Sequence, residues 1–203
     1  MTDLPWDDGV EWFSRRTVAP TELPMTVQHV TSQVLRVANG TVEDAYVSAC
    51  IAAATDACEK DTGRALMPQT WELILSRFPY GSQGIVIPRL PLLSIDSITY
   101  IDEDGTEQTM ASSPADYIVI PSGEFRRARV TPLYGATWPA TRAQKNAVTV
   151  TFQCGCEDNT VPETLLVGIG LMVGEMYKTR TLSADEQSPA MLQVSRFWRK
   201  VEG

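Results

Sequence analysis

Two of the four cysteines form the motif most suggestive of chemistry, Cys154-Gly155-Cys156. Cysteine thiolates bind zinc and act as nucleophiles, so this pair could serve a metal site or a thiol-dependent enzyme. A tetrahedral zinc site takes four ligands, and no second pair stands at a standard spacing from the first. The other cysteines, Cys50 and Cys58, fall on a predicted helix and are too far apart in sequence to face each other. We therefore predict free thiols and no bound metal.

Acid–base or nucleophilic catalysis has little support elsewhere in the chain. His29 is the single histidine, and no Ser/His/Asp or Cys/His set can be assembled around it. Gly168, Gly170 and Gly174 loosely match a dinucleotide-binding loop, but they fall inside a predicted helix rather than between a strand and a helix. Small residues that permit close helix packing explain them better. The sequence predicts no catalytic residue and no cofactor.

Charged residues gather at two places. The run Asp102-Glu103-Asp104 falls on a predicted hairpin tip; a solvated turn is the simplest interpretation, and weak binding of a divalent cation is the alternative. A basic island, defined here as Arg126, Arg127 and Arg129, belongs to a stretch, residues 122–145, with five basic side chains against one acidic, a net charge of +4. The island is either a solvated strand face or a patch that meets an acidic partner, including another copy of this chain.

The composition is that of an acidic globular protein. The chain has 203 residues, 43% of them hydrophobic, and a net charge of −8. This negative charge argues against a protein that binds nucleic acid through contacts to the phosphates. It does not exclude a protein that surrounds DNA. The best candidate for a membrane span, 161–177, is short and contains Glu163 and Glu175. The acidic N-terminus is not a signal peptide, so we expect synthesis in a reducing cytoplasm.

The first part of the chain predicts an arm followed by two helices. Residues 1–24 mix acidic and aromatic side chains with prolines, and we interpret them either as a disordered or draped arm or as a peptide that docks on a neighbouring subunit. A short helix is predicted over 26–37, with Thr26 as its cap. A long helix then begins after Thr41 and ends at Gly63.

Residues 69–156 predict β-structure, because short apolar runs alternate with glycine and proline. The predicted strands cover 71–78, 84–88, 94–102, 106–110, 117–120, 125–133 and 147–153. A third helix follows from Pro162 to about Thr179, then a linker over 181–188 and an amphipathic helix over 189–201. The fold class is therefore α+β: a helical bundle packed with a small antiparallel sheet or sandwich, with extended terminal arms.

The helix over 162–179 is apolar almost all round its circumference, and such a helix is expected to be buried on every side. In a chain of this size, that pattern predicts a subunit interface. The predicted interface residues are the basic island together with Leu166, Ile169, Met172, Val173 and Met176.

With these elements in order, the sequence resembles the head–tail connector (adaptor) proteins of long-tailed phages and gene transfer agents. The order and spacing of the matching pieces carry the resemblance, which covers about residues 26–180. The pieces are Ala53-Ala54 to Cys58-Glu59, Thr62-Gly63-Arg64-Ala65-Leu66, Gln69-Thr70-Trp71-Glu72-Leu73, Phe78-Pro79, Ile87-Pro88-Arg89-Leu90-Pro91-Leu92, Ser97-Ile98-Thr99-Tyr100, Asp104-Gly105, Tyr134-Gly135-Ala136-Thr137-Trp138-Pro139-Ala140-Thr141-Arg142 and Asn146-Ala147-Val148-Thr149-Val150. Where the family usually has Ala-Gly-Tyr-Gly, this chain has Gln153-Cys154-Gly155-Cys156.

The resemblance implies a structural virion protein with no enzymatic activity. Its members form a ring, commonly of twelve copies, that binds the portal and joins it to a neck (stopper) or tail-terminator protein. The ring encloses the DNA that passes during packaging and ejection, without sequence-specific contact and without a membrane. We divide the chain into an arm (1–24), a connector domain (25–180) and a C-terminal segment (181–203), and the resemblance implies that this last segment reaches the portal. The portal-binding residues would be Met191, Leu192, Val194, Arg196, Phe197, Trp198, Arg199 and Lys200.

Two other functions remain open from the sequence. One is a small thiol- or metal-dependent enzyme that uses Cys154 and Cys156. The other is an acidic module that binds a cellular protein.

Overall fold

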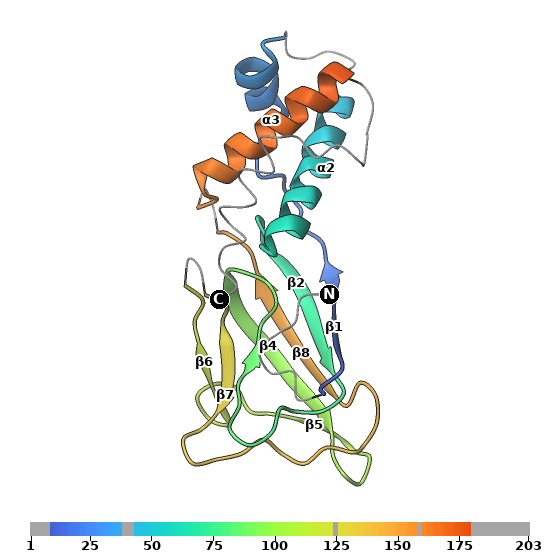
Figure 1. Ribbon diagram of the computed structural model, residues 1–203, viewed down its shortest axis with the longest axis vertical. Helices are drawn as coiled ribbons and strands as arrows, with labels where there is room; N and C mark the ends of the chain where they lie inside the picture. Colours follow the sequence, from blue (N-terminus) through green and yellow to red (C-terminus); the bar gives the residue numbers. More distant parts are fainter. Residues whose placement is uncertain (1–8, 38–42, 124–125, 158–159, 180–203) are drawn as a thin grey trace. The chain divides into compact units, whose positions relative to one another are not determined.

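The computed structural model divides the chain into two compact units, each assembled from two separate segments. The structure describes residues 9–37, 43–123, 126–157 and 160–179 (Figure 1). The first unit comprises residues 1–19 and 68–155, and the second comprises 20–67 and 156–203. The division predicted from sequence followed chain order instead, with an arm, one domain and a C-terminal segment.

The first unit consists of two antiparallel sheets. The five-stranded sheet has the order β1-β2-β8-β4-β5, and the three-stranded sheet has the order β3-β7-β6. The strands are β1 (Trp12–Val18), β2 (Gln69–Leu75), β3 (Ile85–Val86), β4 (Leu92–Ile101), β5 (Glu107–Thr109), β6 (Tyr117–Ile120), β7 (Arg129–Pro132) and β8 (Val148–Cys154). The long strands of the larger sheet lie side by side in Figure 1.

Strand β8 holds the centre of the larger sheet because it pairs with β2 on one side and β4 on the other. Its side chains alternate as predicted: Val148, Val150 and Phe152 are fully buried, whereas the residues between them are partly or wholly exposed. Both sheets contribute fully buried side chains, including Leu73 and Ile85. Apolar alternation on a sheet face is therefore what fixes the register of this unit.

Part of the expected N-terminal arm is strand β1. It pairs antiparallel with β2, with Trp12 opposite Leu75 and Arg15 opposite Glu72. The Arg15 guanidinium donates a 2.7 Å hydrogen bond from Nε to Glu72 Oε2. The prolines that suggested an irregular arm flank this strand rather than interrupt it, since none falls within Trp12–Val18.

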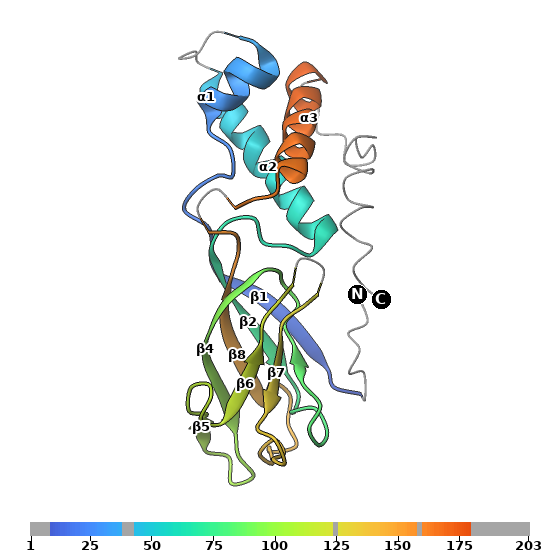
Figure 2. The same cartoon turned by 90° about the vertical axis from the view of Figure 1, so that its left-hand side faces the viewer.

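The second unit is helical. It contains α1 (Val27–His29), the π-helix η1 (Val30–Leu35), α2 (Asp44–Thr62) and α3 (Glu163–Thr179). Figure 2 shows α1, α2 and α3 packed together. Their shared core includes Ile51, Ala54, Leu165 and Ile169. The Tyr46 hydroxyl donates a 3.0 Å hydrogen bond to the Met176 carbonyl, so α2 is also tied to the last turns of α3.

The predicted helix over 26–37 is divided between α1 and a π-helical stretch. Thr26 caps it as expected, and its Oγ1 accepts a 3.1 Å hydrogen bond from the His29 N–H. Thr31 and Ser32 donate their hydroxyls to carbonyls one turn earlier, including the 2.7 Å bond from Ser32 to Gln28. Hydroxyls that compete for helical carbonyls loosen the regular ladder, which gives a reason for the wider turn.

The remaining helix boundaries agree closely with the sequence. Gly63 ends α2 in the left-handed conformation, with φ of 66°, as predicted for that glycine. Helix α2 begins at Asp44 with Glu43 at its cap position, and the predicted cap Thr41 lies outside the described residues. Helix α3 begins one residue after Pro162 and ends at the predicted Thr179. The α+β fold class is confirmed.

Candidate functional site

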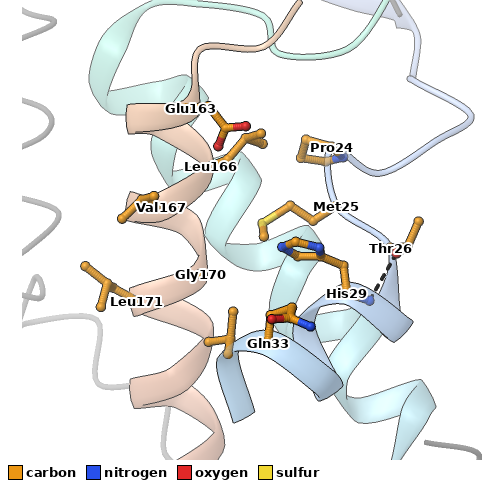
Figure 3. Close-up of a pocket in the computed structure, with 11 residues that line it drawn as sticks. Pro24, Met25, Thr26, His29, Gln33, Glu163, Leu166, Val167, Gly170 and Leu171 are labelled. Atoms are coloured by element: carbon orange, nitrogen blue, oxygen red, sulfur yellow. Dashed lines mark hydrogen bonds between the residues drawn. The ribbon is translucent and has the colours of Figure 1, made fainter. Parts of the chain in front are cut away.

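An open groove lies on the helical unit, in the part of the chain that the structure describes. It encloses about 520 Å³ and lies between the segment 24–34 and helix α3 (Figure 3). Its walls are mainly apolar, with a few polar groups. The lining residues are Pro24, Met25, Thr26, His29, Gln33, Val34, Glu163, Leu166, Val167, Gly170 and Leu171.

Helix α3 builds one wall because its apolar residues occupy two opposite faces. One face enters the unit's own core, where Leu165, Ile169 and Val173 are fully buried. The other face leaves Val167 57% exposed and Leu171 49% exposed. The sequence predicted burial on every side; among the residues that the structure describes, only one face is covered. Large exposed apolar side chains beside a groove are typical of an interaction surface.

The floor of the groove depends on a close approach between two helices. A Cβ atom placed on Gly170 would stand 3.3 Å from Val34 Cγ2 and 3.9 Å from Met25 Cε. Glycine therefore lets α3 approach η1, as the sequence predicted for the small residues of this helix. A larger residue at position 170 would push against Val34 and disturb this packing.

The predicted interface residues fall into two groups. Ile169, Met172 and Val173 belong to the core of the helical unit, so they pack inside the unit and do not contribute to the outer surface of α3. Leu166 lines the groove, and Met176 is partly buried against the same core. The assignment of these residues to a subunit interface stays a prediction. The exposed apolar residues of α3 are Val167 and Leu171, which were not among the interface residues predicted from the sequence.

The basic island belongs to the first unit. Arg126 and Arg129 are exposed and Arg127 is half-buried, while Ala128 between them is buried. Arg126 forms an isolated antiparallel bridge with Gly123, and Arg129 begins β7. The arginines therefore present positive charge at the surface of the first unit, where an acidic partner could contact them.

The cysteines are placed poorly for chemistry. None of these four described cysteines is in a disulfide, and all four are buried, including Cys154 at the end of β8. Burial raises the pKa of Cys58 to about 12, and Glu59 adds to the effect. Burial also raises the pKa of Cys156. Protonated, covered thiols are weak nucleophiles and weak ligands, so the alternative of a thiol- or metal-dependent enzyme loses support.

The acidic hairpin is a self-contained turn. Asp102 accepts hydrogen bonds from the Gln108 side chain at 2.9 Å and from the Thr106 N–H at 2.8 Å. These two bonds hold the pKa of the Asp102 carboxyl below its usual range. Both carboxylate oxygens are thereby engaged, as the solvated-turn interpretation expects. In the described residues no group of three or more His, Cys, Asp or Glu side chains could hold a metal ion.

The predicted portal-binding residues, Met191, Leu192, Val194, Arg196, Phe197, Trp198, Arg199 and Lys200, lie outside the described residues. Their role stays a prediction. Among the helices of the described part of the chain, none has the length and apolar character needed to span a membrane.

Sequence reasoning missed the groove itself. Its two walls are separated by about 130 residues of chain, and no local pattern places the segment around Met25 next to α3. One signal was available: Glu163, Val167, Leu171 and Glu175 recur every four residues, which places them on one face of a helix. All four are exposed.

Three solved structures contain chains with a similar fold. A chain in "Virion of native gene transfer agent (GTA) particle" matches with a TM-score of 0.74 at 21% identity, over 92% of this chain and 95% of that one. A chain in "Neck of empty GTA particle computed with C6 symmetry" gives the same values. A chain in "Neck of native GTA particle computed with C12 symmetry" has a TM-score of 0.68 at 21% identity, over 92% and 94%.

These matches establish a shared fold over nearly the whole length of both chains. No protein-family model matches the sequence, and no curated protein matches it significantly.

Proposed function

We propose that this protein is a structural component of a virion neck, without enzymatic activity. The observation that carries the proposal is the likeness in fold over 92% of the chain to chains of gene transfer agent particles, two of them described as necks. The buried cysteines support it indirectly, because they remove the best candidates for chemistry. The finer role we propose is that of a head–tail connector (adaptor).

In this role the protein forms a ring, and we propose twelve copies. The neck structures with a similar chain were computed with C6 and C12 symmetry, which is compatible with that number. A closed ring needs two different surfaces on each copy, one meeting the other on its neighbour. The basic island and the exposed apolar face of α3 are two such surfaces of unlike chemistry.

The ring would enclose DNA without binding its sequence. Each copy carries a net charge of −8, so twelve copies repel a phosphate backbone rather than trap it. DNA could then pass during packaging and ejection. The proposed site of action is the neck of a particle whose subunits are made in the bacterial cytoplasm.

The proposed partners are the portal on one side and a stopper or tail-terminator protein on the other. The C-terminal segment is the proposed portal anchor, with Phe197 and Trp198 as buried aromatics and Arg196, Arg199 and Lys200 around them. Deletion of 189–203 should abolish portal binding, because these anchors are lost. Circular dichroism should show that both units remain folded, and an unchanged portal affinity in a pull-down titration would refute the anchor.

Ring formation tests the proposal as a whole. Purified full-length protein, alone and with its portal, should give ring-shaped particles by negative-stain microscopy and a matching mass by mass photometry. An Arg126→Glu/Arg129→Glu variant should weaken the ring, since it removes the positive surface. Persistent monomers of the unaltered protein with portal present would overturn the proposal.

A further inference from the structure

The groove of the helical unit has an exposed stripe with a distinctive charge pattern. Along α3 the stripe runs Glu163, Val167, Leu171 and Glu175, at four-residue spacing and with all four side chains exposed. Two apolar residues thus stand between two carboxylates. Figure 3 shows Val167 and Leu171 on the same side of α3, and Glu163 beside Leu166 near the start of the helix. A complementary ligand would have an apolar centre flanked by positive charge.

We propose that the C-terminal segment 189–201 of the same chain docks on this stripe and fills the groove in the free subunit. The segment contains Phe197-Trp198 between Arg196 on one side and Arg199-Lys200 on the other. Its apolar centre and basic flanks are therefore the complement of the stripe. Aromatic residues and arginines are enriched at protein–protein interfaces, and tryptophan and arginine are frequent among the residues that carry most of the binding energy.

Charge selects this segment over the other end of the chain. The helical unit outside the C-terminal segment, residues 20–67 and 156–179, carries ten acidic and four basic side chains, a net charge of −6. Segment 189–201 has three basic and no acidic side chains, a net charge of +3. The N-terminal residues 1–8 also contain a tryptophan, but their three aspartates would be repelled by the same surface.

The length of chain after α3 permits docking within one molecule. Leu171 is eight residues before the helix end at Thr179, a distance of about 12 Å along the axis. The nine residues 180–188 can extend over about 30 Å. As a helix, the thirteen residues 189–201 would be about 20 Å long, enough to cover the stripe from Glu163 to Glu175, which spans about 18 Å.

Docking within one molecule is favoured by its high effective concentration, which for a short linker reaches about the millimolar range. The same segment is the proposed portal anchor, so portal binding would draw it out of the groove. The inference concerns the free subunit, however, and its test uses no portal and no ring. Failure of the docking would leave the proposed neck function standing, and failure of ring formation would leave the docking standing.

Disulfide trapping in the full-length protein tests the proposal. In a Leu171→Cys/Phe197→Cys variant, an intramolecular disulfide should form about tenfold faster than in the matched control, because docking raises the local concentration of the second thiol. The control is Ala52→Cys/Phe197→Cys. Ala52 is exposed on α2, about 9 Å along the helix from Tyr46, which contacts the end of α3 at Met176. The tether therefore reaches both positions.

Peptide mass spectrometry identifies each bond and separates it from the four native cysteines, which are buried. Equal rates in the two variants would overturn the proposal, and so would disulfide-linked dimers in place of bridged monomers. If Leu171→Cys impairs folding, Val167→Cys replaces it on the same exposed face.

Charge reversal supplies an independent readout. Glu163→Lys/Glu175→Lys in the trapping background should slow the disulfide to the control rate, and adding Arg196→Glu/Arg199→Glu should restore it. Glu163 and Glu175 are exposed, so their reversal leaves the core of the helical unit untouched. No slowing on reversal, or no recovery in the combined variant, would contradict the charge complementarity on which the docking rests.

Discussion

Two elements of the molecule use apolar residues in opposite ways. In the β-unit the central strand β8 alternates strictly, and its apolar side chains, such as Val150 and Phe152, are fully buried. In the helical unit α3 buries Leu165 and Ile169 but leaves Val167 and Leu171 exposed beside a groove. A strand whose apolar side chains are all buried serves as a scaffold. A helix with apolar side chains left exposed is where contact with another segment or chain is expected.

The largest expected effect is a loss of unfolding free energy when the core around strand β8 is disrupted. Phe152→Ala removes a fully buried ring at the centre of the larger sheet and should cost about 3–5 kcal/mol of unfolding free energy. Urea denaturation followed by circular dichroism measures it. The control is Glu107→Ala on the exposed strand β5, which should change stability little. Similar losses in both variants would mean that β8 is not the core of this unit.

A matched pair of leucines on α3 tests the comparison inside a single helix. Leu165 is fully buried and Leu171 is 49% exposed, so the same Leu→Ala change probes the two faces. Leu165→Ala should cost about 2–5 kcal/mol of unfolding free energy, whereas Leu171→Ala should cost less than about 1 kcal/mol. Leu171→Ala should instead weaken ring assembly, which mass photometry measures. Equal destabilisation by the two changes would contradict the distinction between a core face and a face outside the core.

A smaller effect is expected on the pH dependence of stability, through the buried thiol of Cys58. The pKa of Cys58 is raised from 9.0 to about 12, because the buried site disfavours the thiolate. In the unfolded chain the thiol ionises near pH 9, so its contribution to stability is full below pH 9 and is lost as pH rises toward 12. The fall in urea midpoint above pH 9 should therefore be shallower in Cys58→Ala than in the unaltered protein.

The rate of thiol labelling under native conditions also tests whether the cysteines are buried and protonated. A thiol-specific reagent at pH 8 should label Cys58 and Cys156 slowly in the folded protein and rapidly in urea. Rapid labelling of the folded protein would reopen the enzymatic alternative.

The local part of this fold could be read from the sequence, and the non-local part could not. Gly63 as a helix end, Thr26 as a cap and the strand Tyr117–Ile120 were predicted where the structure has them, because each depends on neighbouring residues. Strand β1 was interpreted as an arm because its partner β2 begins about 50 residues later. The π-helix was missed since hydroxyl competition by Thr31 and Ser32 leaves the apolar period unchanged.

The candidate site could likewise be predicted from the sequence only in part. The sequence singled out α3, but helical periodicity could not tell which of its apolar faces is used by the chain's own core. That decision depends on where α2 and η1 pack, and the opposite wall of the groove comes from a distant segment. The fold class was predictable from patterns; the exposed face was decided by tertiary packing.

Negative-stain microscopy of the full-length protein with its portal is the decisive test of ring formation. We expect rings of about twelve copies attached to the portal, and loss of those rings when Leu171→Asp places a charge on the exposed face of α3. Unaltered protein that stays monomeric beside the portal would overturn the proposed role in a neck.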